Sequence, residues 1–486
     1  MPPASSPGLL DDHGVGVRPK RLATDRAARI RFRRAMTLML MTLVLPGSAQ
    51  LVAGNKRIGR IALRISAGLV ATVVLSLLVS LLWHGFAFWL VSNTFWLGVI
   101  RFALMLLAVG WAGLFMDAWR LGQPLSLRQN HRLAVVGLNG VLSLSVAGAL
   151  LFGAHLVTVQ RDFIITMFGD GEATSAHDGR YNVLLLGGDS GAGRWGLRPD
   201  SMTIASIDAR TGRTVLFGLP RNMANFPFAK DSVMAEQFPD GFDCDGCYLN
   251  GVSTWAGDNT ELFAHKKNAG VDATIMAIEG ITGLEINYWA MVNLKGFKDL
   301  VDAVGGVTLK VRDRIPVGGL GEKVSGYIEP GVRKLNGHDT LWFARAREGS
   351  DDYSRMARQK CVMSAMLNQI DPKTMVTNFQ QIAKATSGMV QTNLPAGELG
   401  RFMQLAMEAK SQKVSTVSFV PPMINTAHPD IALVKKTVKD AIDRAEGTAG
   451  KPGKAKKKHT TMTGASLGTR DSGYTANDSE DLGAAC

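Results

Sequence analysis

Two long apolar stretches constrain the fold of this chain more than any other feature. Residues 65–83 and 133–154 contain no charged residue, and each is long enough to cross a bilayer as a helix. A third stretch, 95–116, is interrupted only by Arg101, whose long side chain can extend toward the membrane interface. We therefore predict a multi-span α-helical membrane region with spans at about 61–83, 95–116 and 133–156.

The positions of Lys and Arg predict which side of the membrane each segment faces. Eight of these residues lie in 18–34, and cytoplasmic segments are enriched in them. A shorter apolar stretch, 36–53, is broken by Pro46 and Gly47, and basic residues flank it on both sides. We therefore expect it to enter the membrane and return as a re-entrant hairpin. Three full spans then place residues 158 onward outside the cytoplasm, so the predicted location is the cell membrane, with an extracytoplasmic domain.

The basic character of the chain is confined to this first region. Residues 1–132 hold 16 Lys and Arg against 4 Asp and Glu, whereas residues 133–445 hold 32 of each. A nucleic-acid-binding protein is expected to carry its positive charge on the folded domain, so the sequence argues against that class. The composition divides the chain into four parts: a disordered basic cytoplasmic tail at 1–35, the membrane region at 36–157, an outer domain at 178–445 and a disordered tail at 446–486.

Alternating strand and helix patterns predict the fold class of the outer domain. Residues 181–189, YNVLLLGGD, contain the continuous apolar run of a buried strand. Residues 201–208 and 213–220 have the pattern of two strands joined by a turn, which predicts a hairpin. Helices are expected at 272–282 and 295–304. We predict a layered α/β (α+β) domain whose central sheet is covered by helices.

The predicted hairpin gathers charged residues at one end of the sheet. It brings Arg198 and Asp200 to the same end as Arg221. Ligands of open α/β sheets bind at the carboxyl ends of strands, which is where Asp189 follows its strand. Aspartates are also common in turns and helix caps, so this alternative stays open for Asp189 and Asp200.

A second group of arginines lies within the segment TLWFARAREG and in the residues that follow it. We predict that this segment ends a strand, so that Arg345 and Arg347 point to one side of it. The residues that follow have the apolar spacing of a helix, on which Arg355 and Gln359 share a face. The sequence therefore predicts that these side chains converge.

Such a cluster of arginines requires anionic partners. A guanidinium group can bind two phosphate oxygens at once. The N-terminus of the following helix, which Ser350 or Asp351 can cap, favours phosphate as well. The pattern therefore indicates a pyrophosphate site. Structural ion pairing with Glu348, Asp351 and Asp352 is the alternative interpretation, because ion-pair networks also gather arginines.

Two cysteines, Cys244 and Cys247, form a Cys-Asp-Gly-Cys loop. A thioredoxin-type redox site is one interpretation of this spacing. We favour a small structural disulfide, of the kind found outside the cell, because the preceding FPDGFD is loop-like and no strand-to-helix junction is evident.

The order of these segments resembles that of one family. The chain contains, in sequence, YNVLLLGGDSG, RPDSMTIASID, GLPRN, GFKDLVDAVGGVTL, LNGHDTLWFARAR and SRMARQK. Over about residues 178–372 this series resembles the LytR-CpsA-Psr proteins of Gram-positive cell envelopes, and the multi-span N-terminus resembles actinobacterial members. The resemblance implies a membrane-anchored, outward-facing phosphotransferase that moves a glycopolymer from a polyprenyl-pyrophosphate carrier to peptidoglycan or another wall acceptor, usually with magnesium.

The resemblance also assigns roles to particular residues. Asp189 and Asp200 match the family's acidic pair, which holds Mg²⁺ through the pyrophosphate. The family's pyrophosphate-binding residues are matched by Arg198, Arg221, Arg345, Arg347, Arg355, Arg358 and Gln359. The expected catalytic residues are Asp189, Asp200, Arg221, Arg345 and Arg347.

Two positions depart from the family pattern. Members commonly have Asp after Pro-Arg and a basic residue four positions after the arginine, where this chain has Asn222 and Asn225. These changes remove one negative and one positive charge near the proposed site.

Two other functions stay open from the sequence. A hydrolase that releases the glycan phosphate to water would use the same residues. A non-catalytic envelope regulator or receptor is the second alternative, but residues 1–35 are too short for a cytoplasmic DNA-binding module. The expected partners are the lipid-linked glycan, the peptidoglycan acceptor and the membrane, with no nucleic acid.

Overall fold

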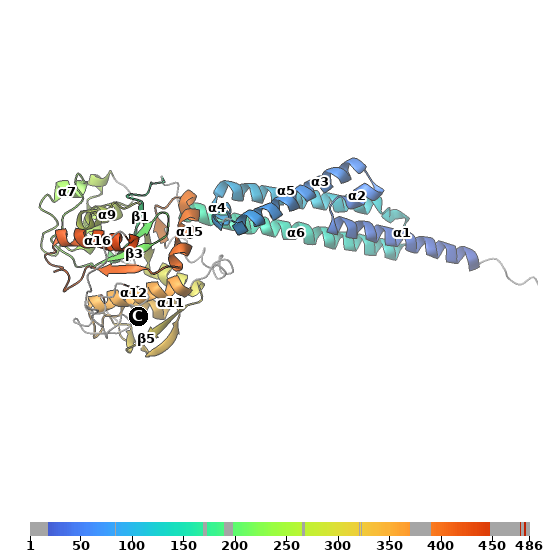
Figure 1. Cartoon of the computed structure of the whole chain (residues 1–486). Coiled ribbons are helices and arrows are strands. Elements are labelled where there is room, and N and C mark those ends of the chain that lie inside the picture. Colours follow the sequence, from blue (N-terminus) through green and yellow to red (C-terminus); the bar gives the residue numbers. More distant parts are fainter. Residues whose placement is uncertain are drawn as a thin grey trace, which may run out of the picture. The chain divides into compact units, whose positions relative to one another are not determined.

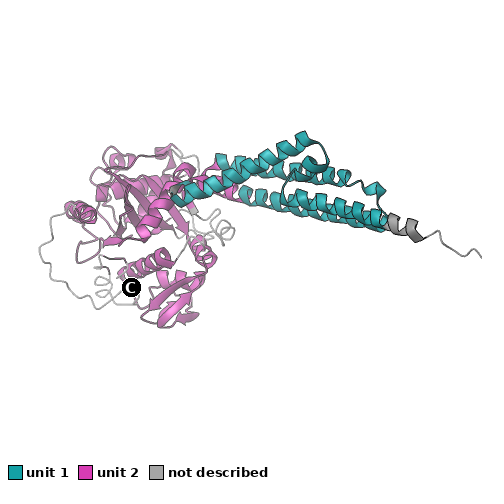
Figure 2. Cartoon of the chain, turned by 45° about the vertical axis from the view of Figure 1, so that its right-hand side comes forward, with its two compact units in different colours: residues 1–87, 95–158 teal, residues 88–94, 159–486 magenta. Residues whose placement is uncertain are grey.

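The protein is described by a computed structural model that covers residues 18–82, 84–168, 173–188, 198–264, 268–319, 321, 323–369, 390–447, 477 and 481–482. The chain forms two compact units, shown in different colours in Figure 2. The first unit comprises residues 1–87 and 95–158, and the second comprises residues 88–94 and 159–486.

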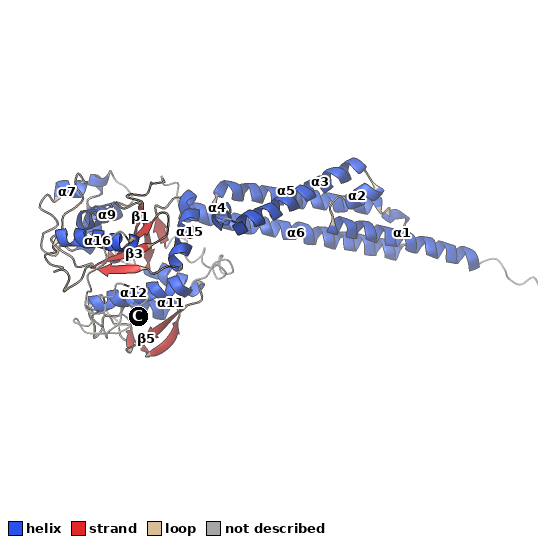
Figure 3. Ribbon diagram, in the orientation of Figure 1, coloured by secondary structure: helices blue, strands red, loops and turns tan. Residues whose placement is uncertain are grey.

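The first unit is helical in the part that the structure describes (Figure 3). Three stretches are long and apolar enough to cross a membrane, namely Lys56–Leu82, Thr94–Ser126 and Gln129–Thr166. They coincide with the three predicted spans. The helices that lie wholly or partly in this unit are α1 (Arg18–Val44), α2 (Ser48–Ala53), α3 (Lys56–Leu82), α4 (His84–Ser92), α5 (Thr94–Leu121), the 3₁₀ turn η1 (Pro124–Ser126) and α6 (Gln129–Met167).

The predicted disorder of residues 1–35 is wrong for residues 18–35, which belong to α1. This segment is rich in Ala and Arg, which are strong helix formers, and its only proline stands at the helix start, where proline is tolerated. High net charge led the sequence interpretation to underestimate this local propensity.

The break predicted at Pro46 and Gly47 is present, because α1 ends at Val44 and α2 begins at Ser48. Gly47 adopts a φ of +93°, and a Cβ atom there would lie 2.6 Å from the Cβ of Ala62, so only glycine fits this turn. The segment thus has a helix-turn-helix form. Whether it is re-entrant stays a prediction.

The second unit is built on a six-stranded mixed sheet in the order β10-β3-β2-β1-β4-β9. Strands β1 and β3 of this sheet are labelled in Figure 1. The pairs β1–β2, β2–β3 and β4–β9 are antiparallel, whereas β1–β4 and β10–β3 are parallel. The strands are β1 (Arg180–Gly188), β2 (Pro199–Asp208), β3 (Thr214–Leu219), β4 (Tyr288–Asn293), β9 (Val390–Thr392) and β10 (Ser415–Ser418).

Helices cover both faces of this sheet, as predicted for a layered domain. On one face, Leu184 and Ile204 pack with Ala277 and Val434 in the largest apolar cluster of the molecule. On the other face, Leu216 packs near Met363. The elements around this sheet are α7 (Val233–Gln237), η2 (Leu249–Gly251), α8 (Val252–Asp258), η3 (Thr260–Phe263), α9 (Ala269–Thr282), η4 (Ala396–Glu398), α15 (Leu399–Lys410) and α16 (Ile431–Glu446).

A smaller lobe with its own apolar cluster completes the unit. Val301, Leu309, Phe343 and Val362 are buried together in this cluster. Its elements are α10 (Leu294–Ala303), β5 (Val307–Val311), β6 (Ile315–Val317), β7 (Gly326–Ile328), β8 (Gly331–Leu335), α11 (Gly337–Arg345) and α12 (Asp352–Gln369). The strands pair as two antiparallel ribbons, β5 with β8 and β6 with β7.

Most of the predicted elements of the outer domain are present, including the hairpin and both helices, but the strand predicted to end at Arg345 is wrong. That segment is helix α11. The Asn336 side chain accepts a hydrogen bond from the backbone N–H of Asp339 and so caps the helix, while Thr340 and Phe343 are buried on one face. Packing on the small lobe outweighs the strand preference of its Thr, Trp and Phe residues.

The predicted disorder of the C-terminal tail also fails for the three tail residues after 447 that the structure describes. Asp481 forms a backbone bridge with Ser415 of β10, and Leu482 is almost fully buried beside Leu216. Asn477 donates a hydrogen bond to the backbone carbonyl of Tyr353 at 2.8 Å. Backbone pairing, one buried apolar residue and polar side-chain contacts, including an ion pair between Lys413 and Asp481 at 2.8 Å, therefore hold these tail residues against the domain.

Candidate functional site

The hairpin of β2 and β3 brings Asp200 and Arg221 together at one end of the main sheet. Antiparallel pairing aligns the start of β2 with the end of β3, so the residues at and just beyond these strand ends are neighbours. The distance from Arg221 Nη1 to Asp200 Oδ1 is 2.6 Å. The predicted rim therefore exists for this pair. Arg198 is described as exposed, and Asp189 lies outside the described residues.

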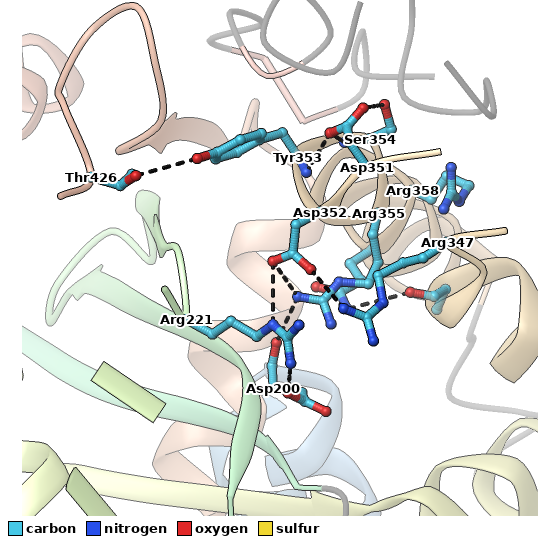
Figure 4. A network of polar contacts seen from close by, with 12 residues as sticks. Asp200, Arg221, Arg347, Asp351, Asp352, Tyr353, Ser354, Arg355, Arg358 and Thr426 are labelled. Carbon is cyan, nitrogen blue, oxygen red and sulfur yellow. Dashed lines mark hydrogen bonds and ion pairs between the residues drawn. The ribbon is translucent and has the colours of Figure 1, made fainter. Parts of the chain in front are cut away.

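Asp352, the first residue of α12, joins this pair to the second arginine group (Figure 4). Its Oδ2 accepts from Arg355 Nη2 at 2.9 Å and from Arg221 Nε at 3.4 Å. Its Oδ1 lies 3.6 Å from Arg347 Nη1. Arg355 Nη2 also donates to the backbone carbonyl of Asp200 at 3.2 Å. We call Asp200, Arg221, Arg347, Asp352 and Arg355 the arginine–aspartate network.

The network shows that ion pairing, the alternative weighed from the sequence, is present at these arginines. Sequence reasoning named Asp352 only in that alternative and missed its central place. The available signal was Asp352 with Arg355 three residues later, because residues three apart on a helix are neighbours.

The N-terminus of α12 lies at the network and is capped by Asp351. Asp351 Oδ1 accepts from the backbone N–H groups of Tyr353 and Ser354, at 2.7 Å and 2.9 Å. Of the two predicted capping residues, Asp351 is therefore confirmed. The cap fixes the first turn of α12, and with it the carboxylate of Asp352.

Burial and charge act in opposite directions on the arginines of the network. Burial lowers the pKa of Arg221, but the carboxylates of Asp352 and Asp200 outweigh it and raise this pKa above its ordinary value. For Arg355, burial lowers the pKa despite the opposing effect of Asp352. The neighbouring carboxylates therefore offset the effect of burial on the pKa for Arg221 but not for Arg355.

Arg358 lies outside the network, so the structure does not bring it together with the other predicted pyrophosphate ligands, and that role stays a prediction. Its side chain is fully buried and donates from Nε to the backbone carbonyl of Phe343 at 2.9 Å, with a second hydrogen bond to the carbonyl of Ala346. Burial lowers the pKa of Arg358 to about 10. Its role in this structure is to hold the end of α11.

Two more of the predicted residues lie on the same helices but outside the network. The Arg345 guanidinium lies over the ring of Trp342, 5.6 Å from its centroid. Gln359 Nε2 donates to the backbone carbonyl of Ala344 at 3.4 Å. The convergence expected from a strand end thus holds for Arg347 and Arg355 through Asp352, and Arg345 contacts a neighbouring aromatic ring.

Two hollows adjoin the network. The first, of about 40 Å³, lies between the main sheet and α12, where Leu216, Met356 and Met363 give it apolar walls. Asp200, Arg221 and Arg355 also line it. The second is open and polar, has a volume of about 380 Å³, and is lined by Arg221, Asn222, Arg347, Glu348, Ser350, Asp351 and Asp352. Arg221 lines both hollows.

The loop after Arg221 is held against a disulfide-bonded segment. Cys244 and Cys247 are joined by a disulfide. Shortly after them, the backbone N–H of Asn250 donates to the carbonyl of Arg221 at 3.1 Å. The disulfide therefore closes a loop whose following residues fix the backbone of a network arginine.

Asp200 offers the hard oxygen atoms that magnesium prefers. Within the described part of the chain, no three His, Cys, Asp or Glu residues are grouped closely enough to hold a metal ion by themselves. A magnesium ion usually keeps several waters and binds one or two carboxylates together with substrate phosphates, so the donor chemistry of Asp200 fits such an ion.

The fold and the network together define an α/β domain with three arginines gathered around one carboxylate at the end of its main sheet, beside two hollows. Comparison with known proteins agrees with this class. The model of the LytR_cpsA_psr family matches residues 160–439, which is more than half of the chain. The chain therefore belongs to the LytR-CpsA-Psr family.

Its relatives include named cell-wall proteins. It is 26% identical over 271 residues to Biofilm regulatory protein A of Streptococcus mutans, covering 54% of this chain and 62% of the relative. It is 24% identical over 284 residues to the polyisoprenyl-teichoic acid–peptidoglycan teichoic acid transferase TagV of Bacillus subtilis, covering 55% and 66%. Cell wall biosynthesis protein LcpA of Corynebacterium glutamicum is 25% identical over 267 residues, covering 50% of each chain.

The matched segments span between half and two-thirds of the length of these relatives. Among solved structures, the crystal structure of B. subtilis TagV is 21% identical, with a TM-score of 0.41, and the match covers 56% of this chain and 100% of that chain.

Proposed function

We propose that this protein is a membrane-anchored phosphotransferase that moves a glycopolymer from a polyprenyl-pyrophosphate carrier to peptidoglycan or another cell-wall acceptor. The observation that carries the proposal is the arginine–aspartate network, in which three guanidinium groups share one carboxylate at the edge of an open polar hollow of about 380 Å³. The hollow of about 40 Å³ beside α12 has room for little more than a water, so a lipid chain would have to displace its walls. Family membership and the printed names of the relatives support the same reaction class.

Arg221, Arg347 and Arg355 would bind the pyrophosphate. The three guanidinium groups lie within 3.6 Å of one carboxylate, so they already share an anion and can exchange it for phosphate oxygens. They would also stabilise the negative charge on the departing polyprenyl phosphate. Arg345 stays a proposed member of the site. It is the last residue of α11, and its guanidinium lies over the ring of Trp342 in the same helix.

The acceptor hydroxyl would attack the phosphorus atom linked to the sugar. A phosphorus–oxygen bond to the acceptor forms, the bond to the bridging oxygen breaks, and the polyprenyl phosphate leaves. Asp189 or Asp200 would orient the hydroxyl or take its proton. Asp200 together with Asp189 would hold magnesium, which when bound would neutralise part of the charge of the pyrophosphate.

We further propose that residues 158 onward lie outside the cytoplasm. The three helices that could cross a membrane support this proposal when they are combined with the enrichment of Lys and Arg at 18–34. Labelling of single introduced cysteines with a membrane-impermeant reagent tests it. Labelling of residue 175 only after the membrane is opened would overturn the proposed topology.

Transfer is tested with the full chain in detergent micelles, a polyprenyl-pyrophosphate-linked glycan, Mg²⁺ and peptidoglycan oligomers. Mass analysis of the products should show the glycan phosphate attached to the oligomer. Release of free glycan phosphate instead would identify the hydrolase, and the absence of any product would favour the non-catalytic alternative.

The variant Asp200→Ala should abolish this transfer while the chain stays folded, because Asp200 lies at a strand end and is partly exposed. Asp299→Ala is a matched control, since that carboxylate pairs with Lys295 on the surface of α10. The control should transfer at the normal rate. Normal transfer by Asp200→Ala would remove Asp200 from the site.

A further inference from the structure

Two oxygen atoms at the polar hollow have no hydrogen-bond donor. They are Asn222 Oδ1 and Asp352 Oδ1, and each is shielded from solvent without a partner among the residues that the structure describes. Both residues line the polar hollow. A buried acceptor without a donor costs free energy, and these two differ from the other such atoms in the described residues because both line the open polar hollow, where a ligand that donates hydrogen bonds could satisfy them.

The cover over Asp352 Oδ1 can move. The nearest described cation is Arg347 Nη1 at 3.6 Å, which is beyond hydrogen-bonding distance, and the Arg347 side chain is 36% exposed. In the complex proposed above, Arg347 would turn to a phosphate oxygen, which would leave Asp352 Oδ1 to a donor on the group attached to the pyrophosphate.

The local charge favours a neutral donor over a cation. Three guanidinium groups, those of Arg221, Arg347 and Arg355, surround the Asp352 carboxylate at 2.9 to 3.6 Å. Close to these three cations, a fourth at the Asp352 carboxylate would gain less than a neutral donor, although Glu348 and Asp351 also line the hollow. Asn222 is itself neutral, so it adds an acceptor without a charge. Hydroxyl groups meet both conditions.

On the basis of the proposed function, we propose that the polar hollow holds the first sugar of the lipid-linked glycan, and that Asn222 is a specificity-determining residue that accepts a hydrogen bond from a hydroxyl of that sugar. This sugar is bonded directly to the pyrophosphate, and the hollow shares Arg221 and Arg347 with the proposed pyrophosphate grip. The peptidoglycan acceptor has no such covalent link to the anion.

The position of Asn222 supports a role in specificity. It follows Arg221 directly, so its side chain stands next to the anion site without supplying a charge to it. Asn225, the other departure from the family pattern, is already used, because its Nδ2 donates to the carbonyl of Ala427 at 2.7 Å. Only the first of these two asparagines has an orphaned oxygen in the described structure.

The test compares two probes on the full chain in detergent micelles with Mg²⁺. The first is farnesyl pyrophosphate, which has no sugar, and the second is farnesyl pyrophosphate carrying one N-acetylglucosamine. Calorimetric titration gives the preference for the sugar-bearing probe as the ratio of the two dissociation constants. In Asn222→Ala this preference should fall by about 2- to 10-fold, the range for one lost hydrogen bond, with little change for the sugar-free probe.

Two further variants control the measurement. Asn222→Asp keeps an acceptor oxygen, so the preference should stay closer to that of the native chain than in Asn222→Ala. Asn259→Ala is the matched truncation outside both hollows, where it removes a hydrogen bond to the carbonyl of Trp255, and it should not change the preference.

Three results would overturn the assignment. An unchanged preference in Asn222→Ala removes this residue from sugar recognition, and equal weakening of both probes makes it a pyrophosphate or metal contact. A raised KM for peptidoglycan oligomers with an unchanged preference would move the hollow to the acceptor. Failure of the native chain to bind either probe would instead refute the proposed function itself, and the sugar assignment with it.

Discussion

Two arginines of one helix, Arg355 and Arg358, are both buried but hold opposite kinds of partner. Arg358 lies on the side of α12 that faces the small lobe, and it donates to the backbone carbonyls of Phe343 and Ala346. Arg355 lies on the side toward the sheet and donates to the carboxylate of Asp352 and the carbonyl of Asp200. Carbonyls at a helix end are fixed and neutral, whereas a carboxylate can be replaced by another anion.

This difference separates structural from functional arginines within a single motif. A buried arginine bound to backbone carbonyls stabilises the fold, and no ligand can take its partners without unfolding the helix end. An arginine that shares a carboxylate with two other guanidinium groups lies beside atoms that are still unsatisfied, among them Arg355 Nε and Asp352 Oδ1. Four predictions follow from the contrast and are ordered by the size of the expected effect.

The largest effect is expected for Arg358→Leu. Loss of the guanidinium leaves two buried carbonyls without these donors, which should cost about 3–5 kcal/mol of unfolding free energy. Thermal melting of the full chain measures this loss. The folded fraction should still bind lipid pyrophosphate, because Arg358 does not reach either hollow. Arg210→Leu, at an exposed turn, is the matched control and should melt normally. A normal melting temperature for Arg358→Leu would erase the contrast.

The second prediction concerns Asp352→Asn. The substitution keeps the shape of the side chain but removes the negative charge that offsets the desolvation of Arg355, whose side chain is only 5% exposed. We expect a loss of about 2–3 kcal/mol, below the 3–5 kcal/mol typical of a fully broken buried pair, because the carbonyl of Asp200 still accepts from Arg355. Melting in the presence of inorganic pyrophosphate should recover part of this stability. Without such recovery, the view that phosphate can replace the carboxylate would be refuted.

Comparison of these residues with the sequence shows where sequence reasoning succeeds. The hairpin register, read from apolar patterns and a turn, was sufficient to bring Asp200 to Arg221. The capping of α12 by Asp351 was equally visible, because it depends on local chemistry. Both features follow from neighbours in sequence or in one hairpin.

Features that depend on distant packing were missed. Helix α11 forms on the small lobe although its residues have strand preferences, so the predicted orientation of Arg345 and Arg347 had the wrong basis. The burial of Arg358 depends on that same helix, which supplies one of its carbonyl partners. A motif of closely spaced arginines does not reveal which of them face the core.

The third prediction concerns Arg347→Gln, a substitution in the arginine–aspartate network. Its contact with Asp352 is long and partly exposed, so loss of the charge should change the unfolding free energy by less than about 1 kcal/mol. Binding of farnesyl pyrophosphate should weaken by roughly ten- to a hundredfold, because a charge-assisted phosphate contact contributes about 1.5–3 kcal/mol. A large loss of stability with undiminished binding would place Arg347 with Arg358 on the structural side.

The smallest effect is expected at Glu279, an acidic counterpart of Arg358 on helix α9. Its Oε1 accepts a hydrogen bond from the backbone N–H of Ile286 at 2.9 Å. Burial raises the pKa of this carboxyl above its ordinary 4.5, with Glu285 acting in the same direction and His177 opposing it. A raised pKa in the folded state means that the protonated form is favoured on folding. Its contribution to stability is therefore complete below pH 4.5 and is lost as the pH rises through the folded-state pKa.

Glu279→Gln removes the buried charge but keeps an oxygen that can accept the hydrogen bond from Ile286. At pH 7 the variant should therefore be slightly more stable than the native chain, because it lacks the desolvated charge. The gain should stay below about 1 kcal/mol, because a neutral hydrogen bond replaces a stronger charge-assisted one. Near pH 4 the difference should disappear, since Glu279 is then largely protonated in both states. Melting temperatures of the two proteins between pH 4 and pH 8 measure this, with Glu236→Gln on the neighbouring surface helix α7 as the control. A Glu279→Gln variant that is less stable at every pH would contradict this prediction. It would show that the native Glu279 side chain stabilises the fold, as the Arg358 guanidinium is expected to do.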